Sequence, residues 1–366
     1  MGPTIIIDKS VLHQLTSDEV RLLNKLYNIN IPEVLLLEIV SDLYKNKKYE
    51  SENVQALQRV AQKLDIPFMV TNVRYPELIA NSLSGQDNMN VRKPVLKGVS
   101  ALQIADGGYC GIIDENPYQE RLARWRKGVV NKQDIDEALE WRKATQNSNT
   151  VALLNNLKDQ GLKFNKHDNL CDVIEDVNTM FGLANAQPFL IEQIVKTTIM
   201  VPELGQEILN RWNRLGRPLL KDFAPYAHFC WKIQFCFIYC VNSGICGSRK
   251  TDICDLQYVM YLPFCDVFCS NDVFHKTFAP AVLLPDQTFI SGDELKSDLA
   301  SILATLSEDP TFNMKTLRGF ESIKPPINEN SFTYKMWKKY TTLMPDNRFS
   351  EIVEMCLASK KREQNH

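Results

Sequence analysis

The chain has 366 residues, of which 44% are hydrophobic and 23% are charged, and its formal net charge is −2. This length fits two or three domains, or one domain with a large insertion, and the composition is that of a globular protein with a sizeable core. A nearly neutral chain is a poor candidate for a passive coat on nucleic acid, although an enzyme with a local basic face stays compatible with it.

The first elements predict a sheet edge that carries acids. Residues 3–7 are a β-branched run with apolar side chains on both faces, which predicts a buried strand that ends at Asp8. The first residues show no basic segment and no long apolar segment, so we expect no signal peptide and a cytoplasmic protein. Residues 10–27 have helical spacing. Residues 28–45 predict a second strand that leads into a helix, with Glu38 in its early part.

The next two hundred residues differ in kind. We expect a mostly helical insertion over residues 46–248, in which residues 66–72 form a short strand and residues 84–118 are loop-like. Turn signals such as Pro188 and Pro202 separate the expected helices, which lie near 50–64, 119–128, 132–146, 149–160, 170–183, 188–199, 203–214 and 222–241.

Two stretches of this insertion combine basic and aromatic residues. Residues 121–132 contain five basic residues and no acids, and residues 205–250 contain seven Lys or Arg against two acids. Such stretches suit a nucleic-acid groove, in which charges follow the phosphates and rings stack on bases. An ordinary solvated helix with core tryptophans explains the same pattern. The candidates for substrate binding are Arg124, Trp125, Arg126, Arg249 and Lys250.

The most apolar stretch, residues 223–241, contains Pro225, His228, Lys232 and Gln234. A membrane span tolerates such residues poorly, so we expect a buried core helix and no membrane partner. Seven of the ten cysteines fall between residues 230 and 269, and none has CxxC or zinc-finger spacing. We expect small buried side chains in a reducing cytoplasm.

The segment TDICDLQYVMYLPFCDVFCSND, residues 251–272, places acids at two element boundaries. Thr251 is the expected N-cap of a helix that holds Asp252 and Asp255 in its first turn, and Pro263 is expected to end that helix. A buried strand is predicted next, with Asp272 directly after it.

The remainder of the chain is expected to return to helices. A further strand is predicted at residues 281–286 and a helix at 292–306. Residues 301–366 are expected to form a helical C-terminal extension with a basic tail.

These acids are expected to meet. In an open parallel sheet, ligands bind at the carboxyl ends of the strands, and the helices that follow start at the same edge. Several carboxylates in one cleft raise each other's pKa unless a cation compensates, and Mg²⁺ or Mn²⁺ are the natural cations for hard oxygen ligands. Such a site suits hydrolysis of phosphodiesters. The acids concerned are Asp8, Glu38, Asp255 and Asp272, with Asp252 as either an extra ligand or a first-turn acid that complements the helix dipole.

The order of these motifs resembles the PIN-domain nucleases. The family has a strand ending in Asp, an acid after a Pro-led helix start, a later helix opening with Asp, and a strand followed by a hydroxyl residue and Asp. Here these read IIIDKSVL, INIPEVLLLEI, DLQYVMYL and VFCSND. The resemblance covers residues 1–45 and 249–300. It implies a three-layer α/β/α core with a parallel sheet, interrupted by the helical insertion.

The same resemblance implies the roles of the residues. Asp8, Asp255 and Asp272 would bind the metal, and Glu38 would bind it through water or orient the attacking water. Ser10 and Ser270 match the small hydroxyl residues that flank the acids in the family. Apart from the resemblance, Arg249 and Lys250 directly precede the acidic helix, so we expect them to reach the scissile phosphate.

The expected function is therefore a divalent-metal-dependent endonuclease that prefers RNA. A DNase of the same superfamily and a catalytically inactive PIN-like scaffold are the alternatives. An effector in defence or stress, or an enzyme of RNA processing, would fit equally, as would a homodimer or an inhibiting or activating protein partner. The sequence has no second Asp two positions after Asp8, as a phosphatase would need, and no GxxxxGK[ST] or GxGxxG nucleotide motif.

Overall fold

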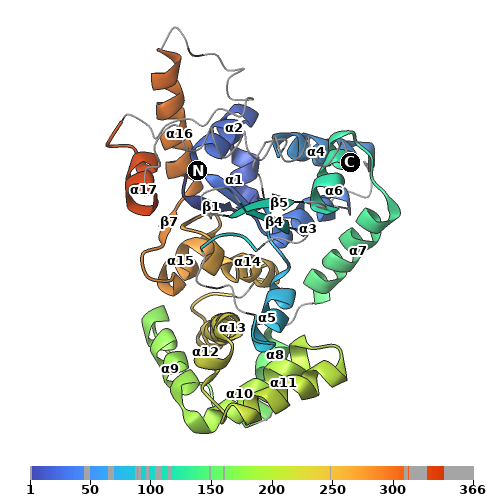
Figure 1. The fold of residues 1–366 in the computed structure, drawn as a ribbon, viewed down its shortest axis with the longest axis vertical. Coiled ribbons are helices and arrows are strands. Elements are labelled where there is room, and N and C mark those ends of the chain that lie inside the picture. The colour runs from blue at the N-terminus through green and yellow to red at the C-terminus, as the bar shows by residue number, and fades with distance from the viewer. Residues whose placement is uncertain are drawn as a thin grey trace.

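The centre of the protein is a five-stranded parallel sheet (Figure 1). The computed structural model describes residues 2–44, 50–64, 70–86, 89, 92–95, 99–103, 109–113, 117–147, 150–159, 161–247, 249–308, 312 and 328–341. The strands lie in the order β3-β2-β1-β6-β7, and all neighbours are parallel. Their bounds are β1 Thr4–Ile7, β2 Asn28–Ile31, β3 Val70–Thr71, β6 Val267–Cys269 and β7 Thr288–Ile290.

The central strand β1 is buried on both faces, which explains its run of isoleucines. Ile5 pairs with Ile29 of β2 on one side and with Val267 of β6 on the other. The strand predicted before Asp8 and the strand predicted before Asp272 are therefore direct neighbours. This confirms a mixed α/β chain with a parallel sheet.

Helices cover both faces of the sheet (Figure 1). On one face α1 (Lys9–Gln14) and α2 (Ser17–Leu26) pack with α16 (Gly292–Ser307). On the other, α14 (Asp252–Val259) packs with α15 (Val273–Val282). The helix α3 (Glu33–Ser41) follows β2 and contacts both α1 and α14. Capping boxes at Thr16–Glu19 and Ser291–Glu294 fix the starts of α2 and α16.

The middle of the chain is mostly helical, but it is not a clean insertion. Its strand β3 pairs with β2 and so belongs to the central sheet. The N-terminal part of the sheet domain therefore extends past residue 46, where the insertion was expected to begin. The stretch expected to be loop-like contains an antiparallel hairpin of β4 (Val99–Gln103) and β5 (Tyr109–Ile113). The helices here are α4 Glu50–Lys63, α5 Tyr75–Leu83, α6 Pro117–Arg126, α7 Lys132–Asn147, α8 Thr150–Asp159, α9 Leu170–Gly182, α10 Gln187–Thr198, α11 Pro202–Arg214, α12 Leu220–Phe223 and α13 Pro225–Ser243.

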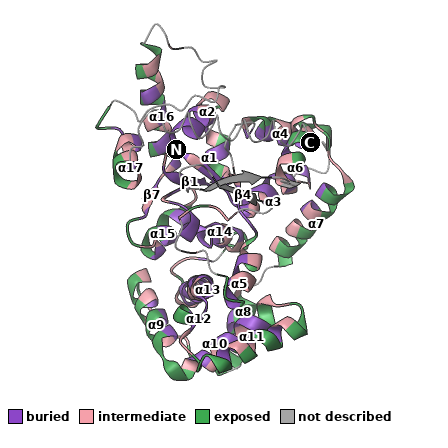
Figure 2. Ribbon diagram, in the orientation of Figure 1, coloured by how far each residue is buried: buried purple, intermediate pink, exposed green. Residues whose placement is uncertain are grey.

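Helices α5 and α8 to α13 form the lower part of the molecule in Figures 1 and 2, which we call the lower helical body. The apolar helix α13 lies in its interior. It packs against α5, α8, α9 and α12, and most of its side chains are buried. This confirms the predicted core helix, although a break before Pro225 separates it from α12. No described helix combines the length and the hydropathy that a membrane crossing demands. Cys171 and the seven cysteines between residues 230 and 269 are free thiols, and six of these eight are buried.

Thr251 occupies the expected N-cap position of α14, although its side chain makes no capping hydrogen bond. Two other local expectations in this part of the chain were wrong. Pro263 lies in a separate 3-10 turn (Leu262–Phe264) after α14 has ended at Val259. The strand predicted at 281–286 does not exist there, because α15 continues through Val282 and the edge strand is β7. Of the C-terminal extension, α17 (Phe332–Tyr340) is helical as expected, whereas the basic tail lies outside the described residues.

Candidate functional site

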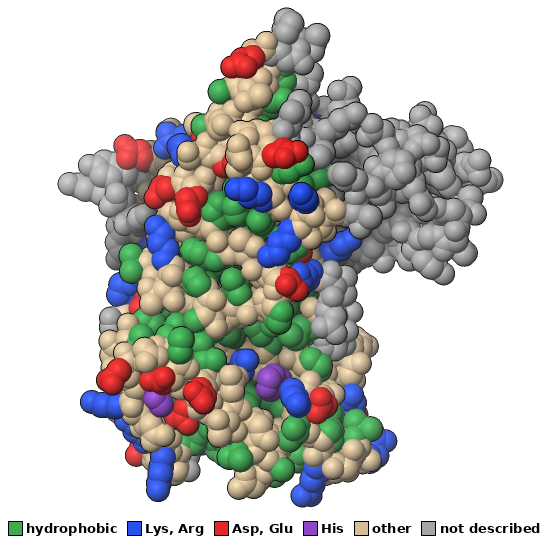
Figure 3. Space-filling model, turned by 90° about the vertical axis from the view of Figure 1, so that its left-hand side faces the viewer, with side chains coloured by type: hydrophobic (Ala, Val, Ile, Leu, Met, Phe, Trp, Pro, Cys, Tyr) green, Lys and Arg blue, Asp and Glu red, His purple; other side chains and the backbone are tan. Residues whose placement is uncertain are grey.

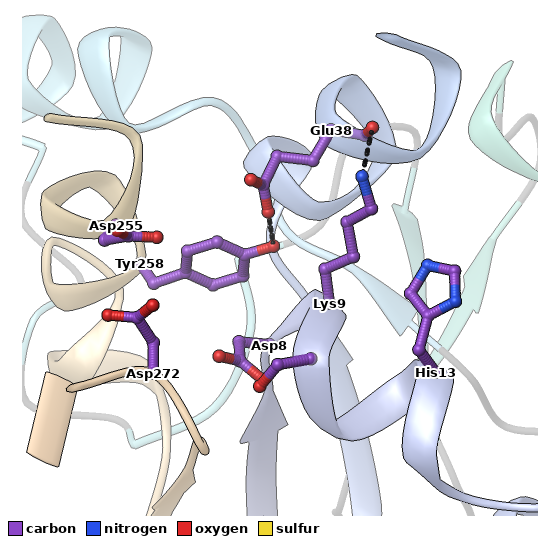
Figure 4. Close-up of a pocket in the computed structure, with 8 residues that line it drawn as sticks. Asp8, Lys9, His13, Glu38, Asp255, Tyr258 and Asp272 are labelled. Carbon is purple, nitrogen blue, oxygen red and sulfur yellow. Dashed lines mark hydrogen bonds between the residues drawn. The ribbon is translucent and has the colours of Figure 1, made fainter. Parts of the chain in front are cut away.

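A pocket of about 320 Å³ opens at the carboxyl edge of the sheet. The chain goes from β1 to β2 on one side and later returns to β6 on the other, so the strand order reverses at β1. Such a reversal is where open parallel sheets form ligand crevices. All four acids expected to meet line this one pocket, together with side chains from α1 and α14 (Figure 4). The full lining is Asp8, Lys9, Ser10, His13, Glu38, Asp255, Tyr258 and Asp272.

The four acids come from four different elements. Asp8 directly follows β1, and Asp272 follows β6 after a two-residue turn. Glu38 lies on α3 and Asp255 in the first turn of α14. Within the described residues, no three Asp, Glu, His or Cys side chains lie close enough to hold one ion together as they stand. The acids thus share a pocket without forming a closed set of ligands.

Asp8 is the most constrained of the acids. One carboxylate oxygen of Asp8 accepts hydrogen bonds from Val11 N (2.9 Å) and from Ser10 Oγ (2.7 Å). The bond from Val11 N caps the start of α1. The other carboxylate oxygen accepts from Ser270 Oγ. Burial alone would raise the pKa of this carboxyl, but His275 and the two hydroxyls outweigh burial and hold the pKa below its usual range. Asp8 is therefore an ionised carboxylate in a fixed orientation, and Ser10 and Ser270 are the residues that fix it.

His275 lies fully buried beneath the pocket and connects two of the acids. Its Nε2 is 2.7 Å from the backbone oxygen of Asp255, which can only accept, so Nε2 carries a proton. Ser270 Oγ gives its single proton to Asp8 and accepts from Asp272 N (3.0 Å), so Nδ1, 2.8 Å away, donates to it as well.

A ring that donates from both nitrogens is an imidazolium. Burial lowers the pKa of His275, but the hydrogen bond and charge of Asp8 outweigh burial and raise it. His275 was not among the residues expected in the site. Its position five residues after Ser270, in the first turn of α15, was the available signal.

Glu38 is held by a tyrosine. Tyr258 Oη donates to Glu38 Oε2 at 2.6 Å (Figure 4). Burial raises the pKa of Glu38, and the Tyr258 hydroxyl and the Lys9 ammonium offset only part of this rise. Lys9 Nζ bonds the Glu38 carbonyl (3.0 Å) and pairs with Asp42 (2.8 Å). The sequence reading missed Tyr258, although it stands three residues after Asp255 and so on the same face of α14.

The pKa of Asp255 lies well above its ordinary value. Burial raises it to about 7, and the charges of Asp272, Glu38 and Asp252 add to the rise, while His275 opposes it. Perturbed carboxyls in a cleft are typical of functional sites.

Arg249 lies at the edge of the pocket and pairs with Asp252, Asp255 and Asp272. Its Nε donates to Asp252 Oδ1 (2.7 Å), and its backbone N–H donates to Asp252 Oδ2 (3.0 Å). Both oxygens of Asp252 are thus bound to Arg249, and Asp252 is buried and does not line the pocket. As it stands, Asp252 is not placed as an extra metal ligand; it is the anchor of Arg249. The neighbouring Lys250 Nζ donates to Gln146 O (3.0 Å).

Trp125 does not provide the stacking surface expected of a nucleic-acid groove. Trp125 is 0% exposed, so its ring cannot stack on a base. Arg124 pairs with the buried Asp134 (3.2 Å), and Arg126 Nε donates to Leu122 O (3.2 Å). The structure therefore supports the alternative of core tryptophans beside ordinary charged side chains. On the coloured part of the face in Figure 3, basic and acidic side chains are interspersed.

Comparison with protein-family models, with curated proteins and with solved structures found no match for this chain. The functional argument therefore depends on the pocket itself.

Proposed function

We propose that this protein is a divalent-metal-dependent endonuclease with a PIN-like core. The observation that supports this best is the meeting of Asp8, Glu38, Asp255 and Asp272 in one pocket at the reversal of strand order. The motif resemblance favours RNA over DNA as the substrate. The lower helical body would then select the substrate or a protein partner.

The chemistry of the donor set fits Mg²⁺ or Mn²⁺. The four acids offer only hard oxygen donors. Burial first, and then the charges of Asp272, Glu38 and Asp252, raise the pKa of Asp255, and a bound cation would offset both effects. Asp8, Asp255 and Asp272 would hold the ion, with Glu38 reached through water. When bound, the ion would lower the pKa of a water and neutralise charge on the phosphate.

The chain's own residues prepare this chemistry. The His275–Ser270 pair keeps Asp8 ionised and in one orientation. Tyr258 holds Glu38, whose raised pKa suits a group that accepts a proton from an attacking water. Positioning of this kind by buried hydrogen bonds is what a rigid catalytic site requires.

A non-catalytic PIN-like scaffold is the second candidate. It is favoured by one observation: the described residues contain no closed set of three ligands, and Arg249 pairs with two of the pocket acids.

Cleavage assays separate the two. Purified protein is incubated with labelled RNA and DNA, with Mg²⁺ or Mn²⁺ or with EDTA, beside Asp8→Asn and the matched control Asp159→Asn, which changes an exposed acid on α8. The endonuclease predicts metal-dependent cleavage that Asp8→Asn lowers at least a hundredfold and Asp159→Asn leaves unchanged. Equal cleavage by both variants, or none by the wild type in any metal, would contradict it.

A further inference from the structure

The side chain of Arg249 contacts three acids at once. Besides its bonds to Asp252, its Nη2 lies 3.1 Å from Asp272 Oδ1 and 3.7 Å from Asp255 Oδ2. Asp255 and Asp272 are two of the three acids assigned above to the metal. A guanidinium is a planar cation that matches carboxylates well, so it compensates the charge of this side of the pocket.

The two ends of Arg249 are held very differently. Its anchor Asp252 has a side chain that is 4% exposed and binds both the backbone and Nε of Arg249. The Arg249 side chain itself is 51% exposed, and the pairs with Asp272 and Asp255 lie at this open end. Exposed ion pairs contribute little free energy, so a stronger cation can break these contacts while the anchor stays in place.

We propose that Arg249 is a built-in competitor of the divalent ion: its guanidinium and the ion alternately compensate Asp255 and Asp272. The inference rests on the proposed function for the identity of the ion. Two cations cannot share these oxygens at bonding distance without strong repulsion, because a guanidinium and a divalent ion would lie only a few ångströms apart. Arg249 therefore raises the concentration of ion at which the site fills.

The same contact explains the open arrangement of the acids. With a guanidinium beside Asp255 and Asp272, the carboxylates do not need to close around a common centre. When the ion binds, Arg249 turns toward solvent and stays tethered to Asp252 at the rim. The divalent ion then replaces the Arg249 guanidinium as the positive charge beside Asp255 and Asp272.

The test is the affinity for Mn²⁺ alone, measured by calorimetric titration and by the electron-spin resonance signal of free Mn²⁺, with no substrate present. Arg249→Gln should bind Mn²⁺ at least fivefold more tightly than the wild type. The control Lys196→Gln removes the same charge from an exposed side chain of α10, a helix that contributes no residue to the pocket, and should change the affinity less than twofold.

A second variant covers the case in which Arg249→Gln does not fold. Arg249→Gln/Asp252→Asn also neutralises the buried carboxylate that Arg249 would leave behind, and it too should bind Mn²⁺ at least fivefold more tightly than the wild type.

The outcomes are distinct. Equal or weaker binding by folded Arg249 variants, with binding by the wild type, overturns the competition and leaves the proposed function standing. Binding only by the variants supports the competition. Absence of binding to every protein at millimolar Mn²⁺ overturns both.

Discussion

At the scale of single residues, the pocket holds carboxyls in opposite states. Asp8 has a lowered pKa because of His275 and two hydroxyls, whereas burial raises the pKa of Asp255 to about 7 and also raises that of Glu38. Groups whose environments move their pKa values apart can take different roles in one reaction. In the proposed metal site, Asp8 would be a permanent ligand, and Asp255 would become a full ligand only on losing its proton.

Asp255 should make metal-free stability depend on pH. Its folded pKa lies above the unfolded value, so its contribution is fully present below about pH 4 and is lost as pH rises through 7. The Asp255→Asn variant has no carboxyl at this position and so does not lose stability in this way. In EDTA, the free energy of unfolding of the variant minus that of the wild type should be about 1–2 kcal/mol larger at pH 8 than at pH 5, as measured by urea unfolding.

The matching binding experiment runs in the other direction. Because the ion needs the carboxylate form, Mn²⁺ affinity of the wild type should rise between pH 6 and pH 8. In the unfolding experiment, an equal effect of Asp255→Asn on the free energy of unfolding at pH 5 and pH 8 would show that this carboxyl does not titrate near neutrality.

At the scale of elements, Asp272 has two separable roles. It is the N-cap of α15, where its Oδ1 accepts from Phe274 N (2.7 Å), and it is a pocket acid. Asn is as good an N-cap as Asp, so Asp272→Asn should keep the stability of the protein but lower metal affinity and cleavage at least tenfold. Asp272→Ala should lower metal affinity and cleavage in the same way, and it should also lower the free energy of unfolding by about 1 kcal/mol because the N-cap is lost. Unfolding curves and Mn²⁺ titrations of the two variants provide the comparison, and similar stability of both would argue against a capping role.

The elements that position the acids could be predicted because their signals are local. A buried β-branched run before Asp8 and an apolar run before Asp272 each end where the strand ends. The two-residue strand β3 is too short for any periodicity, which is why it was placed in an insertion. The apolar residues at 281–286 could not be distinguished from a strand, because a short apolar run also fits the end of a buried helix such as α15.

Side-chain orientation and partners were harder to predict than the elements. Trp125 follows Leu122 by three residues, and both are fully buried, so helical spacing could have placed the tryptophan on the inner face of α6. The contact of Tyr258 with Glu38 joins residues 220 positions apart. Neither that hydrogen bond nor the anchoring of Arg249 by Asp252 follows from spacing, because both depend on the packed positions of α3, α14 and the turn before α14.

At the scale of the whole molecule, the lower helical body supports one side of the pocket. The ring of Phe237 on α13 packs edge-on against Phe274 of α15, with centroids 5.6 Å apart. The same ring lies against Gly247, where a Cβ would come within 2.6 Å of it and where φ is +85°. Phe237 therefore contacts both the start of the helix capped by Asp272 and the turn that leads to Arg249.

This contact predicts that a change inside the helical body reaches the pocket. Phe237→Leu should cost about 1–2 kcal/mol in the free energy of unfolding, as a smaller side chain in a packed core does, and should also lower Mn²⁺ affinity at least threefold. The matched control is Phe235→Leu on the same helix, whose ring contacts Phe181 and Trp231 instead.

The control should lose similar stability without the loss of affinity. Equal effects of both variants on Mn²⁺ binding would show that the body supports the pocket only through overall stability. Thermal melts and titrations at one temperature, well below both transitions, keep the two effects apart.

The pairing of β1 with β6 has a consequence for the synthesis of the protein. Ile5 and its partner Val267 are separated by most of the chain, so the second edge of β1 stays unpaired on the ribosome until β6 has emerged. Asp255 and Asp272 emerge equally late, which means that a nascent or prematurely terminated chain carries Asp8 and Glu38 without the other half of the pocket. The proposed nuclease would thus stay inert beside the message that encodes it until translation has almost finished. The cost is a long-lived unpaired strand edge, which exposes the growing chain to aggregation.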